Sequence, residues 1–374
     1  MYTYFDHSST TPVNDDVLST YFKILQKYFV NSESIYPSGL EVNNLMEKSR
    51  EKTASLLNVL PKEVIFTSSG SEANNLAIKG TALKRSNYGK HIISTSIEHS
   101  SVDKSLKWLE EHLDFEVTYL PVNQNGVIEI EDLKKALRKD TILVSVMYVN
   151  NESGAIMPID EIKSIVRKYP NCYFHCDCVQ AIGKIDFDLS DIDMASISAH
   201  KIYGLKGSGV LIKKQHVQIS ELLSGGQQEF HLRAGTSNAA VNIVFYKTLK
   251  KALEAYRDHR NRIKKYHDYL LEELKKLDKV VINSPENGCY GVINFSCLTI
   301  TSQVMMNALS LKGFEVSAVS TCDSQVAISR VISKMFNDEN RLKGTIRVSI
   351  SHLHSFEDIK GLIEAIKECI EDYG

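Results

Sequence analysis

The sequence predicts an α/β protein in which a mostly parallel seven-stranded sheet forms a large domain beside a smaller α+β domain. Up to about residue 245, short apolar runs rich in β-branched residues alternate with amphipathic segments of helix length. A long charged helical segment and sparser strand signals follow, and 374 residues are more than one small core usually organises. We predict a large domain at residues 13–250 and a small domain formed by residues 1–12 with 251–374.

Each element of this prediction rests on a local pattern. The strands of the large sheet are predicted at residues 63–67, 91–96, 115–120, 141–149, 172–177, 193–199 and 209–213. Amphipathic segments at 72–86 and 159–169 predict helices between them. Residues 246–277 repeat apolar positions at three- and four-residue intervals, which indicates a helix linking the domains. Strands of the small domain are predicted at 292–297 and 345–351.

Charge and composition exclude several classes of function. The net charge is -2, with 44 basic and 46 acidic residues well mixed, so no long-range field favours nucleic acid. The sequence shows neither a secretion signal nor the run of roughly 18 apolar residues that a membrane span needs. Seven scattered cysteines without an export signal favour reduced thiols over disulfides. We expect a cytoplasmic protein that binds neither nucleic acid nor membranes directly.

The segment CYFHCDC at residues 172–178 raises the alternative of a metal site. On a strand, however, Cys176 and Cys178 share one face while Asp177 points to the other. No second cysteine pair follows at the spacing of a zinc finger. We therefore predict no metal and interpret these cysteines as small buried hydrophobic residues.

Polar residues with varied chemistry follow four of the predicted strands, where ligands of parallel sheets bind. The turn SSGSEANN at 68–75 offers N–H groups and hydroxyls to an anion such as phosphate, although it also fits a plain helix cap. His99 and Asp177 each follow a strand, and each alone also fits a structural role. His200 and Lys201 follow the strand at 193–199. Together the four strand ends offer a phosphate site, an imidazole, a carboxylate and an amine.

This combination matches the needs of pyridoxal 5′-phosphate (PLP). The cofactor's aldehyde needs a lysine with which to form a Schiff base, its pyridinium nitrogen needs an acid, and its phosphate needs hydroxyl and N–H donors. Lys201 and Asp177 supply the first two. The sequence therefore predicts a PLP enzyme.

The segment SAHKIYGLKGSG around Lys201 resembles the cofactor-lysine segment of the class V aminotransferase superfamily, and more narrowly that of NifS-like cysteine desulfurases. The resemblance continues in the same order along nearly the whole chain, at FDHSSTTPV (5–13), FTSSGSEANNLAIKG (66–80), IEHSSV (97–102), VTYLPVNQNG (117–126), TILVSVMYVNNESGAIMPI (141–159), HCDCVQAIGKI (175–185), GGQQEFHLRAGTSN (225–238) and IRVS (346–349). It implies PLP fold type I and the conversion of L-cysteine to L-alanine. It also implies that the sulfur passes to an active-site cysteine as a persulfide for delivery to an acceptor protein.

The resemblance implies a role for each matching residue. Lys201 would bind the cofactor aldehyde, Asp177 the pyridinium nitrogen and Gln180 the phenolic oxygen, while His99 would stack on the ring and assist proton transfer. The cofactor phosphate would be held by Gly70, Ser71, Ser198, His200 and, across a homodimer, Thr236. Asn151 would contact the cofactor and would hold the substrate carboxylate together with Arg347, whose guanidinium fork suits two oxygens.

Cys322, in the segment VSAVSTCDSQ (316–325), resembles the family's nucleophilic cysteine. Its polar neighbours predict an exposed loop in which a thiol stays accessible to acceptors. An iron–sulfur scaffold and a tRNA-thiolation enzyme both fit as acceptors. The sequence departs from the family pattern at His7, Phe230, His231 and Val319.

Two alternatives stay open at this point. Another class V activity, such as selenocysteine lyase or an aminotransferase, would use much of the same site, but an aminotransferase would not require Cys322. A noncatalytic protein that keeps the fold as a binding partner would need neither Cys322 nor the cofactor.

Overall fold

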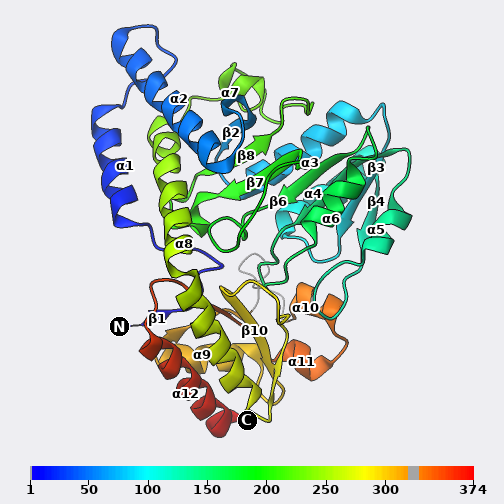
Figure 1. Ribbon diagram of the computed structural model, residues 1–374, viewed down its shortest axis with the longest axis vertical. Helices are drawn as coiled ribbons and strands as arrows, with labels where there is room; N and C mark the ends of the chain where they lie inside the picture. The colour runs from blue at the N-terminus through cyan, green and yellow to red at the C-terminus, as the bar shows by residue number, and fades with distance from the viewer. Residues whose placement is uncertain (1, 319–327) are drawn as a thin grey trace.

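The computed structural model describes residues 2–318 and 328–374 and contains a central seven-stranded sheet (Figure 1). The strand order is β2-β8-β7-β6-β5-β3-β4, and β8 alone runs antiparallel to its neighbours. The strands are β2 (Val64–Thr67), β3 (His91–Thr95), β4 (Glu116–Leu120), β5 (Thr141–Met147), β6 (Tyr173–Asp177), β7 (Met194–Ser198) and β8 (Gly209–Lys213). The predicted mostly parallel sheet and its seven strands are confirmed.

Two helical layers cover this sheet because its strands are apolar on both faces. One face packs on α3 (Gly70–Arg85) and α4 (Ser100–Leu113) through side chains such as Ile65 and Ile92. The other face packs on α2 (Pro37–Leu57), α5 (Ile130–Ala136), α6 (Ile159–Val166) and the first half of α8 (Ala239–Lys275). Burial on both faces is what an open parallel sheet requires. Cys176 and Cys178 lie buried in this second core as free thiols, as predicted.

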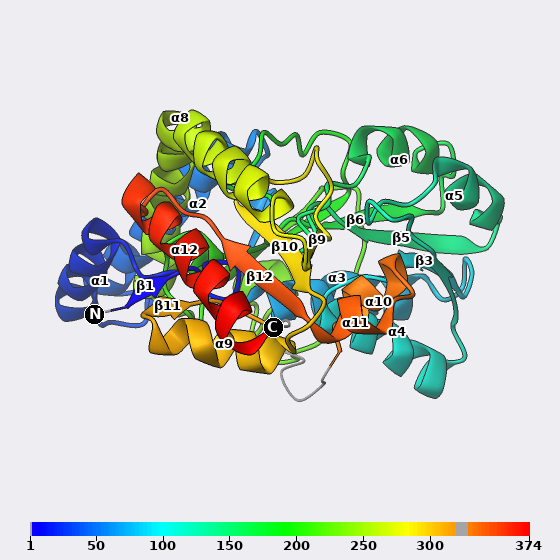
Figure 2. The ribbon, with the colours of Figure 1, turned by 90° about the horizontal axis from the view of Figure 1, so that it is seen from below.

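A second, three-stranded antiparallel sheet has the order β12-β10-β9 and lies below the first in Figure 1. It contains β9 (Val280–Ile282), β10 (Val292–Cys297) and β12 (Thr345–Ser349). Figure 2 shows α9 (Ser302–Leu311) and α12 (Phe356–Tyr373) beside this sheet. The strands predicted at 292–297 and 345–351 thus both form. The exact domain boundaries stay a prediction.

The first residues of the chain pack with the small sheet. The next helix, α1 (Asp15–Lys27), instead packs against α8 beside the large sheet. β1 (Thr3–Tyr4) pairs in parallel with β11 (Phe314–Glu315), and Phe5 is buried in the core around β10 and α12. The chain then crosses toward the large sheet through the N-terminal segment, residues 6–11. The remaining helical pieces are η1 (Pro61–Glu63), η2 (Ala199–Lys201), α7 (Gln228–His231), α10 (Arg330–Met335) and α11 (Glu339–Lys343).

The long helix α8 links the two cores, as its amphipathic pattern predicts. Phe245 and Leu249 pack under the large sheet, whereas Leu270 and Leu274 pack in the core of the small sheet. The helix begins at Ala239, earlier than expected, because the Asn238 side chain accepts a hydrogen bond from the Val241 N–H and caps it. None of the described helices is long and apolar enough to cross a membrane.

Candidate active site

A cavity of about 270 Å³ lies at the carboxyl ends of the parallel strands, where the two sheets approach each other. Ten of the twelve predicted site residues line it, namely Gly70, Ser71, His99, Asn151, Asp177, Gln180, Ser198, His200, Lys201 and Arg347. They come from segments that span most of the chain. Thr236 does not line this cavity, and Cys322 lies outside the described residues.

Lys201 reaches the cavity from the short turn η2, which directly follows β7. Its Nζ donates hydrogen bonds of 2.6 Å to the carbonyl oxygens of both Ser8 and Ser9. The N-terminal segment is tied to the same turn, since the Thr11 N–H donates to the His200 carbonyl at 2.9 Å. Burial lowers the pKa of His200 to about 4, so its ring is neutral near pH 7. The turn therefore offers one amine and one neutral imidazole.

Asp177 ends β6 and is almost fully buried. Its Oδ1 accepts from the Val179 N–H at 3.0 Å, so the turn-stabilising role considered for it is real. Its Oδ2 accepts from Asn74 Nδ2 at 2.8 Å, and Asn74 Nδ2 also lies 2.9 Å from Ser101 Oγ. Sequence reasoning missed Asn74. Its position one helical turn beyond the Ser-Gly turn was the available signal.

The Ser-Gly turn before α3 is shaped for a close approach. Ser69 caps the helix by accepting from the Glu72 N–H at 3.1 Å. A Cβ at Gly70 would lie 2.8 Å from Val179 Cγ2 and 3.2 Å from Ser198 Cβ, so a side chain there does not fit. Ser198 Oγ is buried and has no hydrogen-bond partner in the described part of the chain. The N-terminus of α3 and the unsatisfied hydroxyl at the end of β7 thus lie close together, which suits an anion.

His99 is the N-cap of α4 and also lines the cavity. The Ser101 N–H donates to its Nδ1 at 3.2 Å, so the proton of the neutral ring is assigned to Nε2. The neighbouring Glu98, which sequence reasoning also missed, is buried and accepts from Thr95 Oγ1 at 2.7 Å and the Met147 N–H at 3.0 Å. Burial raises the pKa of Glu98 to about 8.

Arg347 reaches the cavity from β12 of the small sheet and is only 2% exposed. Its Nη1 donates to the Asn151 carbonyl at 2.9 Å, and its Nη2 donates to Asp6 Oδ1 at 2.6 Å and Ser9 Oγ at 2.7 Å. Within residues 2–318 and 328–374, its Nε–H has no acceptor. A buried guanidinium with a spare donor suits a carboxylate ligand.

Thr236 lies in a separate hollow of about 180 Å³, together with Thr67, Ser68 and Arg233. The turn before it is strained, because Glu229, Phe230 and His231 have φ values of 46°, 57° and 65°. Thr236 is exposed and lies beside the residues that precede α3, not in the cavity that contains Lys201. Its prediction as a contact to a second subunit stays untested.

Known proteins resemble this chain in both sequence and fold. Residues 3–362 match the family model Aminotransferase class-V. The chain is 39% identical to a cysteine desulfurase IscS of Dictyoglomus turgidum, over 98% of this chain and 94% of that protein. A solved NifS-like protein superposes with a TM-score of 0.94 at 34% identity and covers all of both chains. The structure of SspA in complex with cysteine has a TM-score of 0.82 at 29% identity, over 94% of this chain and 99% of that one.

Proposed function

The chain belongs to the aminotransferase class-V family, and from this we propose that it is a PLP-dependent cysteine desulfurase. The observation that carries the proposal is the convergence of Lys201, Asp177 and Arg347 on one cavity. These side chains bring an amine, a carboxylate and a guanidinium from three distant segments. L-cysteine is the substrate, and L-alanine and a protein-bound sulfur atom are the products.

The cavity fits PLP. The unsatisfied Ser198 hydroxyl, the close approach at Gly70 and the N-terminus of α3 together suit a phosphate. Ser71 and His200 also line the cavity. Asp177 would hold the ring nitrogen, Gln180 the phenolic oxygen and Lys201 the aldehyde carbon. When bound, the cofactor supplies a conjugated ring that stores the electron pair released as the substrate loses its Cα proton.

The protein's own residues orient the substrate and move its protons. Asn74 and the Val179 N–H each donate to one oxygen of the Asp177 carboxylate and fix it in place. The carboxylate therefore does not have to reorganise when it meets a ring nitrogen. Arg347 and Asn151 would bind the carboxylate of L-cysteine, with the Arg347 Nε–H as a donor still to be satisfied. His99, whose Nε2 carries the ring proton, would assist the proton transfers.

Cys322 is the proposed sulfur acceptor, although it lies outside the described residues. Its sulfur would form an S–S bond with the substrate sulfur while the substrate Cβ–S bond breaks. The electron pair of that bond stays with the carbon product, which takes up a proton to become alanine, and the persulfide stays on Cys322. An acceptor protein, such as an iron–sulfur scaffold or a tRNA-thiolation enzyme, would then take the sulfur. We place this reaction in the cytoplasm, since the six described cysteines are all free and buried.

We also propose that the enzyme works as a homodimer. Large apolar side chains are exposed along α1 and its connection to α2, including Phe29 at 82% and Ile35 at 91%. Contiguous apolar surface of this kind marks an interaction site. The short helix α7, which contains the exposed Phe230 and is followed by Thr236, lies near α2 in Figure 1. A second copy that covers this surface would bring its own Thr236 toward the cavity.

The decisive test compares sulfide and alanine release from L-cysteine, with a reductant, by the PLP-loaded wild type, Cys322→Ala and Cys172→Ala. We expect Cys322→Ala to keep the cofactor's visible absorbance but to lose release. Cys172→Ala is the matched control, because Cys172 is a buried thiol directly before β6, at the opposite end of that strand from Asp177 and the cavity. Equal release of sulfide and alanine by all three proteins would contradict the role of Cys322 and would point to another thiol as the sulfur acceptor.

A further inference from the structure

Both polar atoms of the Gln180 side-chain amide are hydrogen-bonded, and their partners allow only one orientation of the amide. Its Nε2 donates to the Ser8 carbonyl at 2.9 Å, and its Oε1 accepts from Lys184 Nζ in a short hydrogen bond. A carbonyl can only accept and an ammonium can only donate. The amide nitrogen therefore lies on the side of Ser8 and the cavity. One of its N–H groups is bonded to Ser8, and the second has no acceptor among the residues that the structure describes.

Lys184 lies behind Gln180 as seen from the cavity. It lines a smaller hollow on the other side of the N-terminal segment, where Ser8 and Lys201 are shared by both spaces. Burial lowers the pKa of Lys184 to about 8, so the ammonium form dominates near pH 7. Burial is the main cause that lowers the pKa values of His7 and His200, and the charge of Lys184 adds to both shifts. Its electrostatic influence therefore extends to the residues around Lys201.

We propose that Lys184 is a positioning residue that holds the Gln180 amide with its second N–H directed at the cofactor's phenolic oxygen. The inference rests on the proposed function, since it takes PLP as the ligand and Gln180 as its contact. The hydrogen bond and the nearby positive charge act in the same sense. Both make the amide N–H a stronger donor to an anionic oxygen.

This role predicts a spectroscopic effect. A donor to the cofactor oxygen stabilises the deprotonated form of the cofactor bound to Lys201, so it lowers the pH at which the visible absorbance changes. Lys184→Met removes the group that fixes the donor and should raise this midpoint by about one pH unit. Gln180→Leu removes the donor itself and should raise the midpoint by at least as much.

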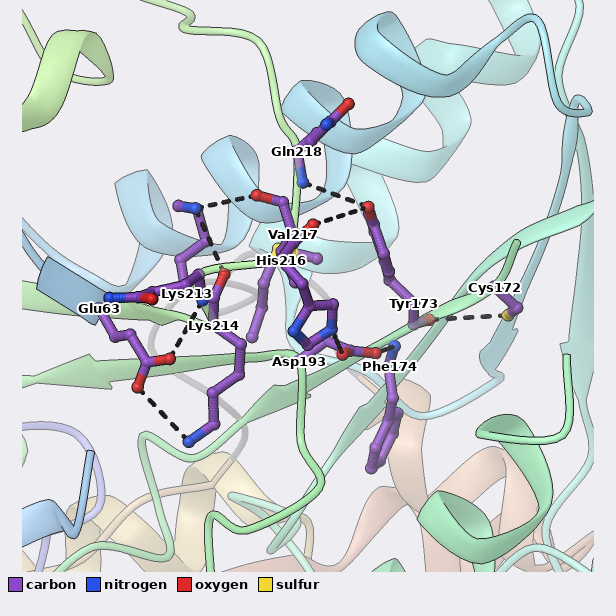
Figure 3. Close-up of polar contacts among 12 residues, drawn as sticks. Glu63, Cys172, Tyr173, Phe174, Asp193, Lys213, Lys214, His216, Val217 and Gln218 are labelled. Carbon is purple, nitrogen blue, oxygen red and sulfur yellow. Dashed lines mark hydrogen bonds and ion pairs between the residues drawn. The ribbon is translucent and has the colours of Figure 1, made fainter. Parts of the chain in front are cut away.

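The experiment is a pH titration of the absorbance of PLP-loaded wild type, Lys184→Met, Gln180→Leu and the double variant. If Lys184 acts through Gln180, the double variant shifts no further than Gln180→Leu alone. Lys184→Leu, which likewise has neither the charge nor a hydrogen-bond donor, replaces Lys184→Met if the latter does not fold. The matched control is Lys213→Met. Burial lowers the pKa of Lys213 too, but its Nζ donates to the Lys214 and Val217 carbonyls, away from the cavity (Figure 3).

Two outcomes would overturn the inference while leaving the proposed function intact. One is a Lys184→Met protein that binds PLP and titrates like the wild type. The other is a double variant whose shift equals the sum of the two single shifts, because Lys184 would then act independently of Gln180. A wild type that shows no cofactor absorbance at all would instead contradict the proposed function and the inference together.

Discussion

Glu98 shows how strongly the surroundings of the cavity affect a single carboxyl group. Its Oε1 accepts two hydrogen bonds, whereas its Oε2 is buried and has no partner within the described residues. Burial is the main cause that raises its pKa to about 8, and the nearby Asp177 adds to the effect. The group is thus neutral in the folded protein at a pH where it would be ionised in the unfolded chain.

This shift predicts a pH-dependent stability. Between the ordinary glutamate pKa and about 8 the folded state binds one more proton at Glu98 than the unfolded state, so rising pH costs stability. Glu98→Gln has no such proton to lose. The free energy of unfolding of the variant, relative to that of the wild type, should therefore rise by up to about 1.4 kcal/mol per pH unit in that window. Denaturant unfolding of both proteins between pH 5.5 and 8 measures the difference.

The matched control for this prediction is Glu111→Gln, which removes an exposed carboxylate from α4. The free energy of unfolding of this variant should change with pH as that of the wild type does. If the free energy of unfolding of Glu98→Gln also follows the wild type across the pH range, Glu98 is ionised in the folded protein.

Sequence reasoning reached the residues that follow strands and missed those that support them. Lys201 and Asp177 could be found because the end of a parallel strand marks a place in the fold. Asn74 left only one signal, its position one helical turn beyond the Ser-Gly turn, and Lys184 left none. Both act on Asp177 and Gln180 through side-chain contacts that no periodicity encodes. The acceptors of Lys201 lie more than 190 residues away along the chain.

At the scale of elements, α7 is fixed by a buried ion pair rather than by its own backbone. Glu229 accepts from Arg50 of α2 at 2.7 and 2.9 Å, and from the Phe66 N–H of β2 at 2.8 Å. The Arg50 guanidinium also lies over the rings of Phe66 and Phe230. These contacts hold the left-handed turn that precedes Thr236.

Removing one partner of this pair should be costly. Arg50→Met leaves the Glu229 carboxylate buried without its counter-charge, and we expect a loss of about 3–5 kcal/mol in the free energy of unfolding. The double variant Arg50→Met/Glu229→Leu should recover part of this loss, because no uncompensated charge remains. Denaturant unfolding of both variants checks this, and a wild-type value for Arg50→Met would show that the pair does not hold the turn.

The strands of the large sheet were predictable because they are short apolar runs, and all except the edge strand β4 have buried residues on both faces. Helix ends were less predictable. Residues 159–169 were expected to be helical, yet α6 ends at Val166, and the chain then turns ahead of Pro170. The left-handed run at Glu229, Phe230 and His231 could not be foreseen, since neither glutamate nor phenylalanine favours this conformation.

For the whole molecule, the exposed apolar surface around α1 and α2 predicts the assembly state. Light scattering should give twice the chain mass of 42.1 kDa. Phe29→Glu/Ile35→Glu should shift the protein toward the monomer and weaken PLP binding, because Thr236 of the partner subunit is lost. Leu311→Glu is the control, since Leu311 is equally exposed, at 87%, but lies on α9 beside the small sheet. A monomeric wild type with full activity would refute the dimer.

The pairing of β1 with β11 has a consequence for how the protein is made. Thr3 and Tyr4 leave the ribosome before their partners, since Phe314 and Glu315 follow more than 300 residues later. At about 5–20 residues per second, the first strand waits roughly a quarter of a minute to a minute. Until then Ser8 and Ser9 have their contacts to Gln180 and Lys201 on the large-sheet side, but the strand ahead of them has no partner on the small-sheet side. Nascent chains that stall before Phe314 therefore lack one of the two attachments that place this segment between the sheets.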